Sequence, residues 1–441
     1  MNVPSQANKD AERLSELSDG FRTGRLSVLS YLTGLESRFA GRESLVKAFV
    51  PESLDRFERF RREFARLESR FPDPRFRPPL FGIPVGVKDI FHAEGFPTRG
   101  GSRLPPDVLQ GEEAKSVGLL KCAGALVLGK TVTAEFAYLA PGPTRNPHNL
   151  EHTPGGSSSG SAAAVAAGLC PIAVGTQTIG SILRPASYCG VVGFKPSYGR
   201  IPLGGVIPLS PSVDHVGFFA ADVEGTTLIA SVLCEGRAAR RELKPLVFGV
   251  PEGPYLEKAS EGGLRHFRQT CDRLSDAGFE LRSVEMLTDF DTVSERHYTL
   301  VAAEAAIVHG EWFDRYSGRY HEKTAELILN GRTVSSNFLE ACRAGRERLR
   351  AEIEDQMKCH SFSVILAPAA VGPAPRGIDS TGDPVMNLPW SHAGLPAVSL
   401  PSGMSGEEMP MGLQLIGSWM GDEALLEVAR QVEEVFDGHH H

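Results

Sequence analysis

The sequence predicts an α/β fold, because short apolar segments alternate with longer helical patterns along most of the chain. Two early segments have the apolar, β-branched texture of strands, and the helical pattern EEAKSVGLLKCAG lies between them: PLFGIPVGVKDIF from Pro79 and ALVLGKT from Ala125. The chain closes with two further strand-like runs, GLPAVSLPSG and MGLQLIG, and the amphipathic helix EALLEVARQVEEVF. This alternation indicates a sheet covered by helices.

The length of 441 residues allows either two domains or one large unit with an insertion. Residues 1–70 carry apolar positions at helical spacing among many charges, which predicts an N-terminal helical layer packed on the core. We expect the α/β domain over 71–438, with the charged, helical stretch at about 252–360 as a flank or lid. The histidines at 439–441 resemble the start of a purification tag and are not candidates for a catalytic role.

Composition narrows the class of function. The chain has 46 basic and 54 acidic residues and a net charge of -8, which argues against a nucleic-acid partner and favours a small-molecule substrate. The seven scattered cysteines predict neither a disulfide framework nor a metal site. Neither an apolar leader nor a run of roughly 20 apolar residues is present, so we expect a cytoplasmic protein without a membrane partner.

Residues Gly124–Thr131, GALVLGKT, match the phosphate-loop pattern G-x-x-x-x-G-K-[ST]. That motif requires an irregular loop between a strand and a helix, whereas here a helix precedes it and residues 125–128 themselves have the texture of a strand. A strand leading into a turn explains the segment better. Nucleotide binding through Lys130 remains the alternative from another class of protein.

A second pattern, GSSSG at 156–160, matches the nucleophile elbow of α/β-hydrolases, with Ser158 as its serine. The elbow requires an apolar strand immediately before it, and NPHNLEHTPG is not apolar. Asp214 and His215 could complete a Ser-His-Asp triad. Since the chain has 13 histidines, one beside an aspartate is expected by chance, and this triad is the weaker hypothesis.

Lys88 stands in the strand-like run GIPVGVKDIF. Side chains alternate along a strand, so Lys88 and Gly86 face one side, while Val85, Val87 and Asp89 face the other. Burying a charged amine among apolar residues is costly, so the pKa of Lys88 should fall toward neutrality. A lysine of that kind has the protonation behaviour of a general base.

Five segments together resemble the amidase signature family of Ser-cisSer-Lys hydrolases, from about Pro79 to Phe436. They are GIPVGVKDIF, GKTVTAEFAYLAPGPTRNPHN, TPGGSSSGSAAAVAAG, VGTQTIGSILRPASYCGVVGFKPSYGRIP, and GLPAVSLPSG with MGLQLIG. The resemblance implies a single large α/β domain whose mixed β-sheet is flanked by helices on both faces. It also implies a hydrolase that acts on carbon–nitrogen bonds other than peptide bonds, without a metal or organic cofactor.

The resemblance also implies roles for particular residues. By position in the family motifs, Lys88 is the base, Ser157 the relay with a cis peptide, and Ser181 the nucleophile. The oxyanion hole falls on the amides of Thr178, Ile179, Gly180 and Ser181, and such donors are often the largest electrostatic contribution to acyl transfer. Thr176 and Ser159 match the supporting network, and Tyr138 and Arg184 are candidate substrate contacts.

Two departures from the family pattern bear on the substrate. The usual G-T-D-T-G-G-S has Gln177 in place of the acid and Ile179 in place of the first glycine. A β-branched residue avoids positive φ, so the turn must use ordinary dihedral angles and the Ile179 side chain either packs inward or narrows the pocket. The family arginine lies one position later, at Arg184, where it either holds a substrate carboxylate or forms a structural ion pair.

The resulting expectation is an amidase for small amides, and possible substrates extend to aryl amides, carbamates or esters, because all pass through an acyl-enzyme. We expect a monomer or homodimer. The alternative within the family is the amidase subunit of a tRNA-dependent amidotransferase, and the changes at Gln177 and Ile179 weigh against it.

Overall fold

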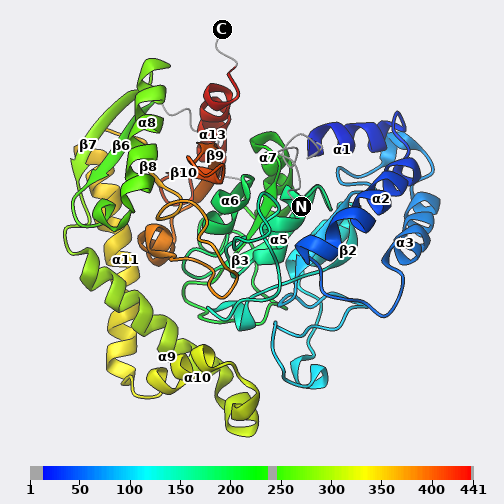
Figure 1. Ribbon diagram of the computed structural model, residues 1–441, viewed down its shortest axis with the longest axis horizontal. Helices are drawn as coiled ribbons and strands as arrows, with labels where there is room; N and C mark the ends of the chain where they lie inside the picture. The colour runs from blue at the N-terminus through cyan, green and yellow to red at the C-terminus, as the bar shows by residue number, and fades with distance from the viewer. Residues whose placement is uncertain (1–12, 237–245, 439–441) are drawn as a thin grey trace.

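The structure is a computed structural model that describes residues 13–236 and 246–438. The first twelve residues of the expected helical layer and the closing histidines 439–441 lie outside this range. A ten-stranded sheet runs through the molecule (Figure 1). Its strands are β1 Pro84–Lys88, β2 Leu126–Thr131, β3 Ile172–Gln177, β4 Val192–Lys195, β5 His215–Ala220, β6 Val247–Glu252, β7 Glu280–Glu285, β8 Val364–Pro368, β9 Ala397–Met404 and β10 Pro410–Ile416.

The sheet is mixed, with the strand order β2-β1-β3-β5-β4-β9-β10-β8-β6-β7. β1 pairs in parallel with β2 and β3, and β6 pairs in parallel with β7 and β8. The strands between these two parallel groups pair antiparallel. This confirms the predicted α/β class and the mixed sheet. Because β5 lies beside β3, His215 pairs with Gln177, and the residues just before β5 reach the end of β3.

Helices cover both faces of the sheet. α5 and α6 pack against β3, β4 and β9 and against each other, whereas α7 and α13 pack against β4, β5 and β9 and also against each other. The helices in the described part of the chain are α1 Leu14–Thr23, α2 Val28–Val46, α3 Arg56–Arg70, α4 Lys115–Cys122, α5 Ser159–Ala166, α6 Leu183–Cys189, α7 Val223–Leu233, α8 Glu261–Asp276, α9 Phe290–Tyr316, α10 Glu322–Gly331, α11 Ser336–Cys359, α12 Leu388–Ala393 and α13 Asp422–Phe436.

The stretch at about 252–360 contains α8 to α11 and also the edge strand β7. Figure 1 shows α9, α10 and α11 extending away from the end of the sheet that carries β6 and β7. α9 and α11 pack against each other, and both pack against α12, which lies near the candidate site. A role for this stretch as a lid stays a prediction.

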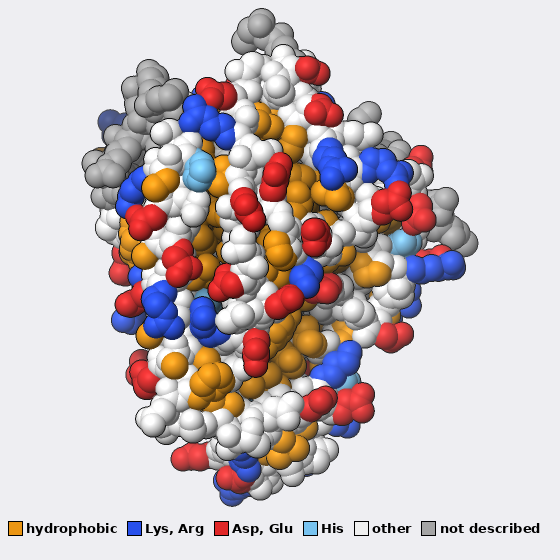
Figure 2. Space-filling view, turned by 90° about the vertical axis from the view of Figure 1, so that its left-hand side faces the viewer, with side chains coloured by type: hydrophobic (Ala, Val, Ile, Leu, Met, Phe, Trp, Pro, Cys, Tyr) orange, Lys and Arg blue, Asp and Glu red, His pale blue; other side chains and the backbone are white. Residues whose placement is uncertain are grey.

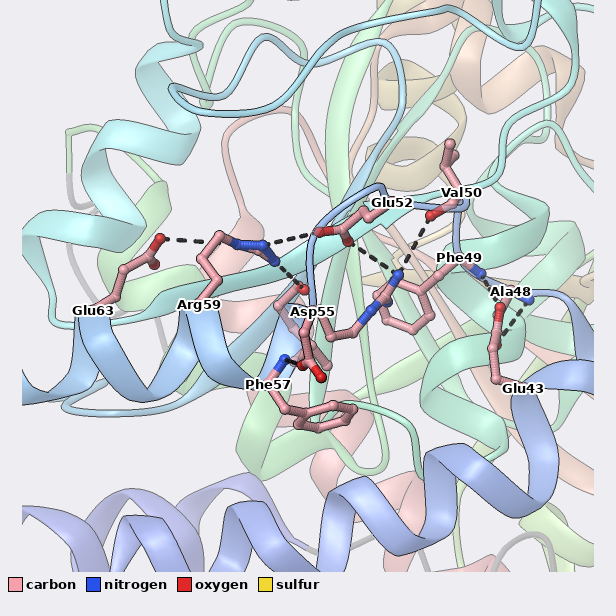
Figure 3. A network of polar contacts seen from close by, with 11 residues as sticks. Glu43, Ala48, Phe49, Val50, Glu52, Asp55, Phe57, Arg59 and Glu63 are labelled. Atoms are coloured by element: carbon pink, nitrogen blue, oxygen red, sulfur yellow. Dashed lines mark hydrogen bonds and ion pairs between the residues drawn. The ribbon is translucent and has the colours of Figure 1, made fainter.

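The N-terminal helices lie at the opposite side of the molecule and attach to the edge strand β2 through a polar network (Figures 1 and 3). Arg59 donates a hydrogen bond to the Leu128 carbonyl over 2.8 Å and forms an ion pair with Glu52 over 3.0 Å. Glu43, near the end of α2, accepts hydrogen bonds from the amides of Ala48 and Phe49. Burial raises the pKa of Glu43 to about 7, against the opposing effect of these two hydrogen bonds.

Figure 2 shows the side of the molecule that lies at the left of Figure 1, where acidic, basic and apolar side chains are interspersed. Exposed apolar residues on α9 to α11 include Ile307, Leu329 and Phe338. No helix in residues 13–236 or 246–438 combines the length and the apolar character that crossing a membrane requires.

Candidate active site

The candidate base lies at the carboxyl end of β1, which is the strand next to the edge strand β2. Lys88 is the last residue of β1 and is completely buried. Its amine donates hydrogen bonds to Ser157 Oγ over 2.8 Å and to Thr176 Oγ1 over 2.9 Å. Thr176 belongs to the neighbouring parallel strand β3, so the sheet brings its hydroxyl to the amine, whereas Ser157 comes from the loop before α5.

Burial decides the protonation state of Lys88. Removal from water lowers the pKa of the Lys88 amine well below its usual value, and the negative charge of Asp214 partly opposes this shift. Both hydrogen-bond partners are neutral hydroxyls, which stabilise an ammonium less than a carboxylate would. At any given pH, a larger fraction of this amine is therefore neutral, and able to accept a proton, than of an exposed lysine amine.

The candidate relay lies in a tight glycine-rich segment. The Gly156–Ser157 peptide bond is cis, and the preceding Gly155 has φ +83°. A side chain at Gly155 would meet the backbone of Pro185 in α6, so glycine is required on both conformational and steric grounds. Ser159 Oγ is 3.5 Å from the Ser157 carbonyl, at the start of α5.

The candidate nucleophile Ser181 lies in the turn between β3 and α6, and only 7% of it is exposed. Gln177 stabilises this turn, because its Oε1 accepts hydrogen bonds from the amides of Ile182 and Leu183 over 2.8 and 3.0 Å. Gln177 thus satisfies two free amides at the beginning of α6. This explains how a neutral glutamine serves where the family pattern has an acid.

Ile179 adopts an ordinary negative φ, as its β-branched side chain predicts. The side chain is 5% exposed and belongs to an apolar cluster with Leu183, Met386 and Trp390. At the next position, any side chain in place of Gly180 would collide with the Asn387 amide group. The turn is thus closely packed around Ile179 and Gly180.

Arg184, on the first turn of α6, is 1% exposed. Its Nη2 donates to the Gly156 carbonyl over 2.6 Å and to Thr381 Oγ1 over 3.2 Å. Among the described residues its buried Nε and Nη1 have no hydrogen-bond partner, and no carboxylate there forms an ion pair with it. The structural ion pair, one of the two predicted roles, is therefore absent from this part of the chain.

Tyr138 is half-buried and packs beside an apolar cluster that includes Leu209, Val213 and Leu300. Electrostatic interactions connect Tyr298 on α9 with Tyr138, Arg184 and Asp383.

The competing motifs have structural roles instead. Ser158 Oγ bonds the backbone of Thr176 as both donor and acceptor. Lys130 lies within β2 rather than in a loop, and it forms a buried ion pair of 2.8 Å with Asp89. A phosphate loop needs an irregular turn whose amides converge on the phosphate, and residues 126–131 form an extended strand instead.

The aspartate and histidine proposed for a triad also point to different partners. The Asp214 carboxylate accepts a hydrogen bond from Thr178, whereas His215 Nδ1 faces the Gln177 carbonyl over 3.1 Å. In the part of the chain that the structure describes, no group of three or more His, Cys, Asp or Glu residues could hold a metal ion.

Comparison with known proteins agrees with this geometry. The family model described as Amidase matches residues 44–426. The chain belongs to the amidase family. A solved amidase structure is 32% identical, with a TM-score of 0.87, and the match covers 96% of this chain and 100% of that one. The peptide amidase of Stenotrophomonas maltophilia is 26% identical, with a TM-score of 0.80 and coverage of 96% and 97%.

The relatives found by sequence comparison carry the name of one particular kind of amidase family member. A glutamyl-tRNA(Gln) amidotransferase subunit of Geotalea daltonii is 31% identical over 97% of each chain. The same subunit of Geobacter metallireducens is 32% identical over 82% of this chain and 85% of its own. These names correspond to the alternative that Gln177 and Ile179 weigh against, rather than to the small-molecule amidase that the motifs favour. Both kinds of relative act on C–N amide bonds, so the amidase family member described here is an enzyme of that class.

Three residues of this amidase site carry no motif signal of their own. Ser391, Thr381 and Asn387 come from a C-terminal region far from the glycine-rich block in sequence, and they contact Gln177, Arg184 and Gly180 respectively. Contacts over such separations are tertiary, and single-residue patterns do not reveal them.

Proposed function

We propose that this enzyme hydrolyses amide-type C–N bonds with Ser181 as nucleophile, Ser157 as proton relay and Lys88 as base. The observation that carries the proposal is the 2.8 Å hydrogen bond between a fully buried lysine amine and the Ser157 hydroxyl. A buried amine with a lowered pKa has the lone pair that a general base requires.

The reaction then takes two steps. Ser181 Oγ attacks the amide carbonyl while its proton passes to Ser157 and the Ser157 proton passes to Lys88. Collapse of the tetrahedral intermediate breaks the C–N bond, and Ser157 protonates the leaving nitrogen, regaining its own proton from Lys88. Water attacks the acyl-enzyme through the same relay, which releases the acid and restores Ser181. The amides of Thr178, Ile179, Gly180 and Ser181 are the proposed donors to the oxyanion.

The environment of Arg184 favours substrates that carry a carboxylate. A buried guanidinium with two nitrogens that lack a partner among the described residues is costly, and a ligand carboxylate would offset this cost. We therefore favour amides whose acyl part carries a carboxylate, such as half-amides of diacids. Tyr138 and Tyr298 are proposed to lie along the same ligand. Carbamates and aryl esters remain chemically accessible through the same intermediate.

A second candidate is favoured by the names of the sequence relatives. As the amidase component of an amidotransferase, the chain would release ammonia from an amide and act with partner subunits on a glutamyl-tRNA. The same Ser–Ser–Lys chemistry would serve it. The experiment that separates the two is expression of the chain alone and in its host: an independent amidase turns over as a monomer or homodimer, whereas an amidotransferase component co-purifies with partners and depends on them.

The direct test of the mechanism is labelling with a fluorophosphonate, followed by peptide mass spectrometry. We expect one adduct, on Ser181, and no adduct in Ser181→Ala, which removes the attacking oxygen with little change in volume. An adduct on Ser158 would instead support the elbow hypothesis.

A further inference from the structure

A buried carboxylate links the proposed oxyanion turn to the loop that precedes β5. Asp214 is 5% exposed, and its Oδ1 accepts a short hydrogen bond from Thr178 Oγ1. Its Oδ2 accepts from the amides of Leu209 and Ser210 over 2.8 and 2.9 Å. Three donors from two segments therefore converge on one carboxylate, and two of them fix the loop 209–214 around it.

We propose that Asp214 is a positioning residue of the catalytic centre: its carboxylate fixes the Thr178 end of the oxyanion turn, and its charge acts on the Lys88 amine. This role rests on the proposed Ser–Ser–Lys mechanism and adds a residue that this mechanism does not use. Oxyanion donors work only when their positions are set before the reaction, so a fixed anchor beside Thr178 contributes directly to their effect.

The electrostatic part starts from the pairing of β5 with β3, in which Val216 lies opposite Thr176, the residue whose hydroxyl accepts a hydrogen bond from Lys88. Asp214 lies two residues before Val216. Its charge raises the pKa of Lys88, against the larger lowering by burial. Burial raises the pKa of Asp214 itself to about 6, so its carboxylate is ionised at pH 7 and above. The other ionisable groups facing it are Glu304 on α9, which raises its pKa further, and Tyr198 from the segment after β4.

Glu304 on α9 provides a matched control, because it is a second buried carboxylate that accepts hydrogen bonds from the same loop. It accepts hydrogen bonds from Ser210 Oγ and from the amide and hydroxyl of Ser212, and Arg343 on α11 is its ion-pair partner. Its removal would loosen the same loop. However, the charge that shifts the pKa of Lys88 is that of Asp214 and not that of Glu304.

The test measures the rate of Ser181 labelling by a fluorophosphonate as a function of pH. In Asp214→Asn the shape is kept and the charge is lost, so the ammonium of Lys88 is less stable. The pH at which the labelling rate is half of its alkaline plateau, the midpoint, should therefore move to lower pH. Glu304→Gln should leave the midpoint unchanged. Thr178→Val should lower the alkaline plateau roughly 10-fold, and Thr178→Ser, which keeps the hydroxyl, should restore it.

If the pH midpoint of labelling is unchanged in Asp214→Asn, or shifts equally in Glu304→Gln, the proposed effect of the Asp214 charge on Lys88 is wrong. Equal plateaus in Thr178→Val and wild type would overturn the positioning part, even if Asp214→Asn fails to fold. If the wild-type enzyme is labelled at Ser181 and Lys88→Met is not, the mechanism stands and these outcomes concern Asp214 alone. Absence of labelling at Ser181 in the wild type would overturn both proposals.

Discussion

Gln177 donates a hydrogen bond to Ser391 over 2.9 Å, and Ser391 in turn donates to the carbonyl of Ile179 over 2.6 Å. The side chain of Ser391 therefore links the Gln177 side chain to the backbone of the turn that carries Ser181. We expect Ser391→Ala to lower the free energy of unfolding by about 1–3 kcal/mol, because the buried Ile179 carbonyl loses its donor. The rate of hydrolysis should fall as well, since the turn is less firmly held. Urea unfolding and steady-state kinetics measure the two effects.

Ser399 is the matched control for this change. It is a fully buried serine on β9 whose hydroxyl has no hydrogen-bond partner among the described residues. Ser399→Ala should therefore leave both stability and rate close to those of the wild type. If the two variants lose equal stability, the hydrogen bond from Ser391 is not the cause.

The segments that form this site could be predicted from the sequence, whereas several of the side-chain contacts between them could not. The strand texture around Lys88 and the glycine-rich block identify which segments meet, because parallel neighbouring strands end at one edge of a sheet. Ser391 and Asp214 could not be assigned in this way. Their partners depend on the order of β3, β5 and β4 in the sheet and on the placement of α12, which are tertiary relations without a local pattern.

Ile179 provides a test of pocket shape. We expect Ile179→Gly to raise kcat/KM for bulky acyl or leaving groups relative to small ones, because it removes an apolar side chain from the cluster beside the turn. Glycine also loosens the oxyanion amides, so the absolute kcat should fall. The measured quantity is therefore the ratio of kcat/KM for a bulky and a small amide. Equal ratios in the variant and the wild type would show that Ile179 faces away from the substrate.

Arg184 determines the expected preference for anionic substrates. Arg184→Gln should lower kcat/KM for a half-amide of a diacid by roughly 10- to 100-fold, since a hydrogen bond to a charged group contributes about 1.5–3 kcal/mol. A neutral amide of the same length is the control, and its kcat/KM should change much less. An equal loss for both substrates would indicate that Arg184 only supports the Gly156 carbonyl.

Glu43 gives a prediction about stability and pH. Its pKa is raised in the fold to about 7 from the usual value of 4.5, so the fold favours the neutral carboxyl. The stability that Glu43 contributes is complete below about pH 4.5 and is lost as pH rises toward 7. Glu43→Gln removes this titration, so the difference in unfolding free energy between the variant and the wild type should shift in favour of the variant by roughly 3 kcal/mol between pH 4.5 and pH 8. The same difference at both pH values would contradict the assignment.

Lys88 and Lys130 lie at the ends of adjacent parallel strands, and only Lys130 has a carboxylate partner among the described residues. If neutral Lys88 accepts the proton, kcat/KM should rise with pH through an apparent pKa well below the usual lysine value and level off on the alkaline side. The midpoint belongs to the coupled network of Lys88, Ser157 and Ser181. Lys88→Met keeps the length and apolar volume of the side chain and should lose roughly 100-fold or more in rate, with the fold retained.

Lys130→Met is the control, because it removes the amine that the phosphate-loop hypothesis requires. The change leaves Asp89 as an unpaired buried carboxylate, so we expect lower stability, by about 3 kcal/mol or more, together with a normal pH profile in the folded protein. Circular dichroism establishes the folded fraction of each variant before the rates are compared. Loss of activity in folded Lys130→Met, with a normal pH profile in Lys88→Met, would show that the essential amine is Lys130.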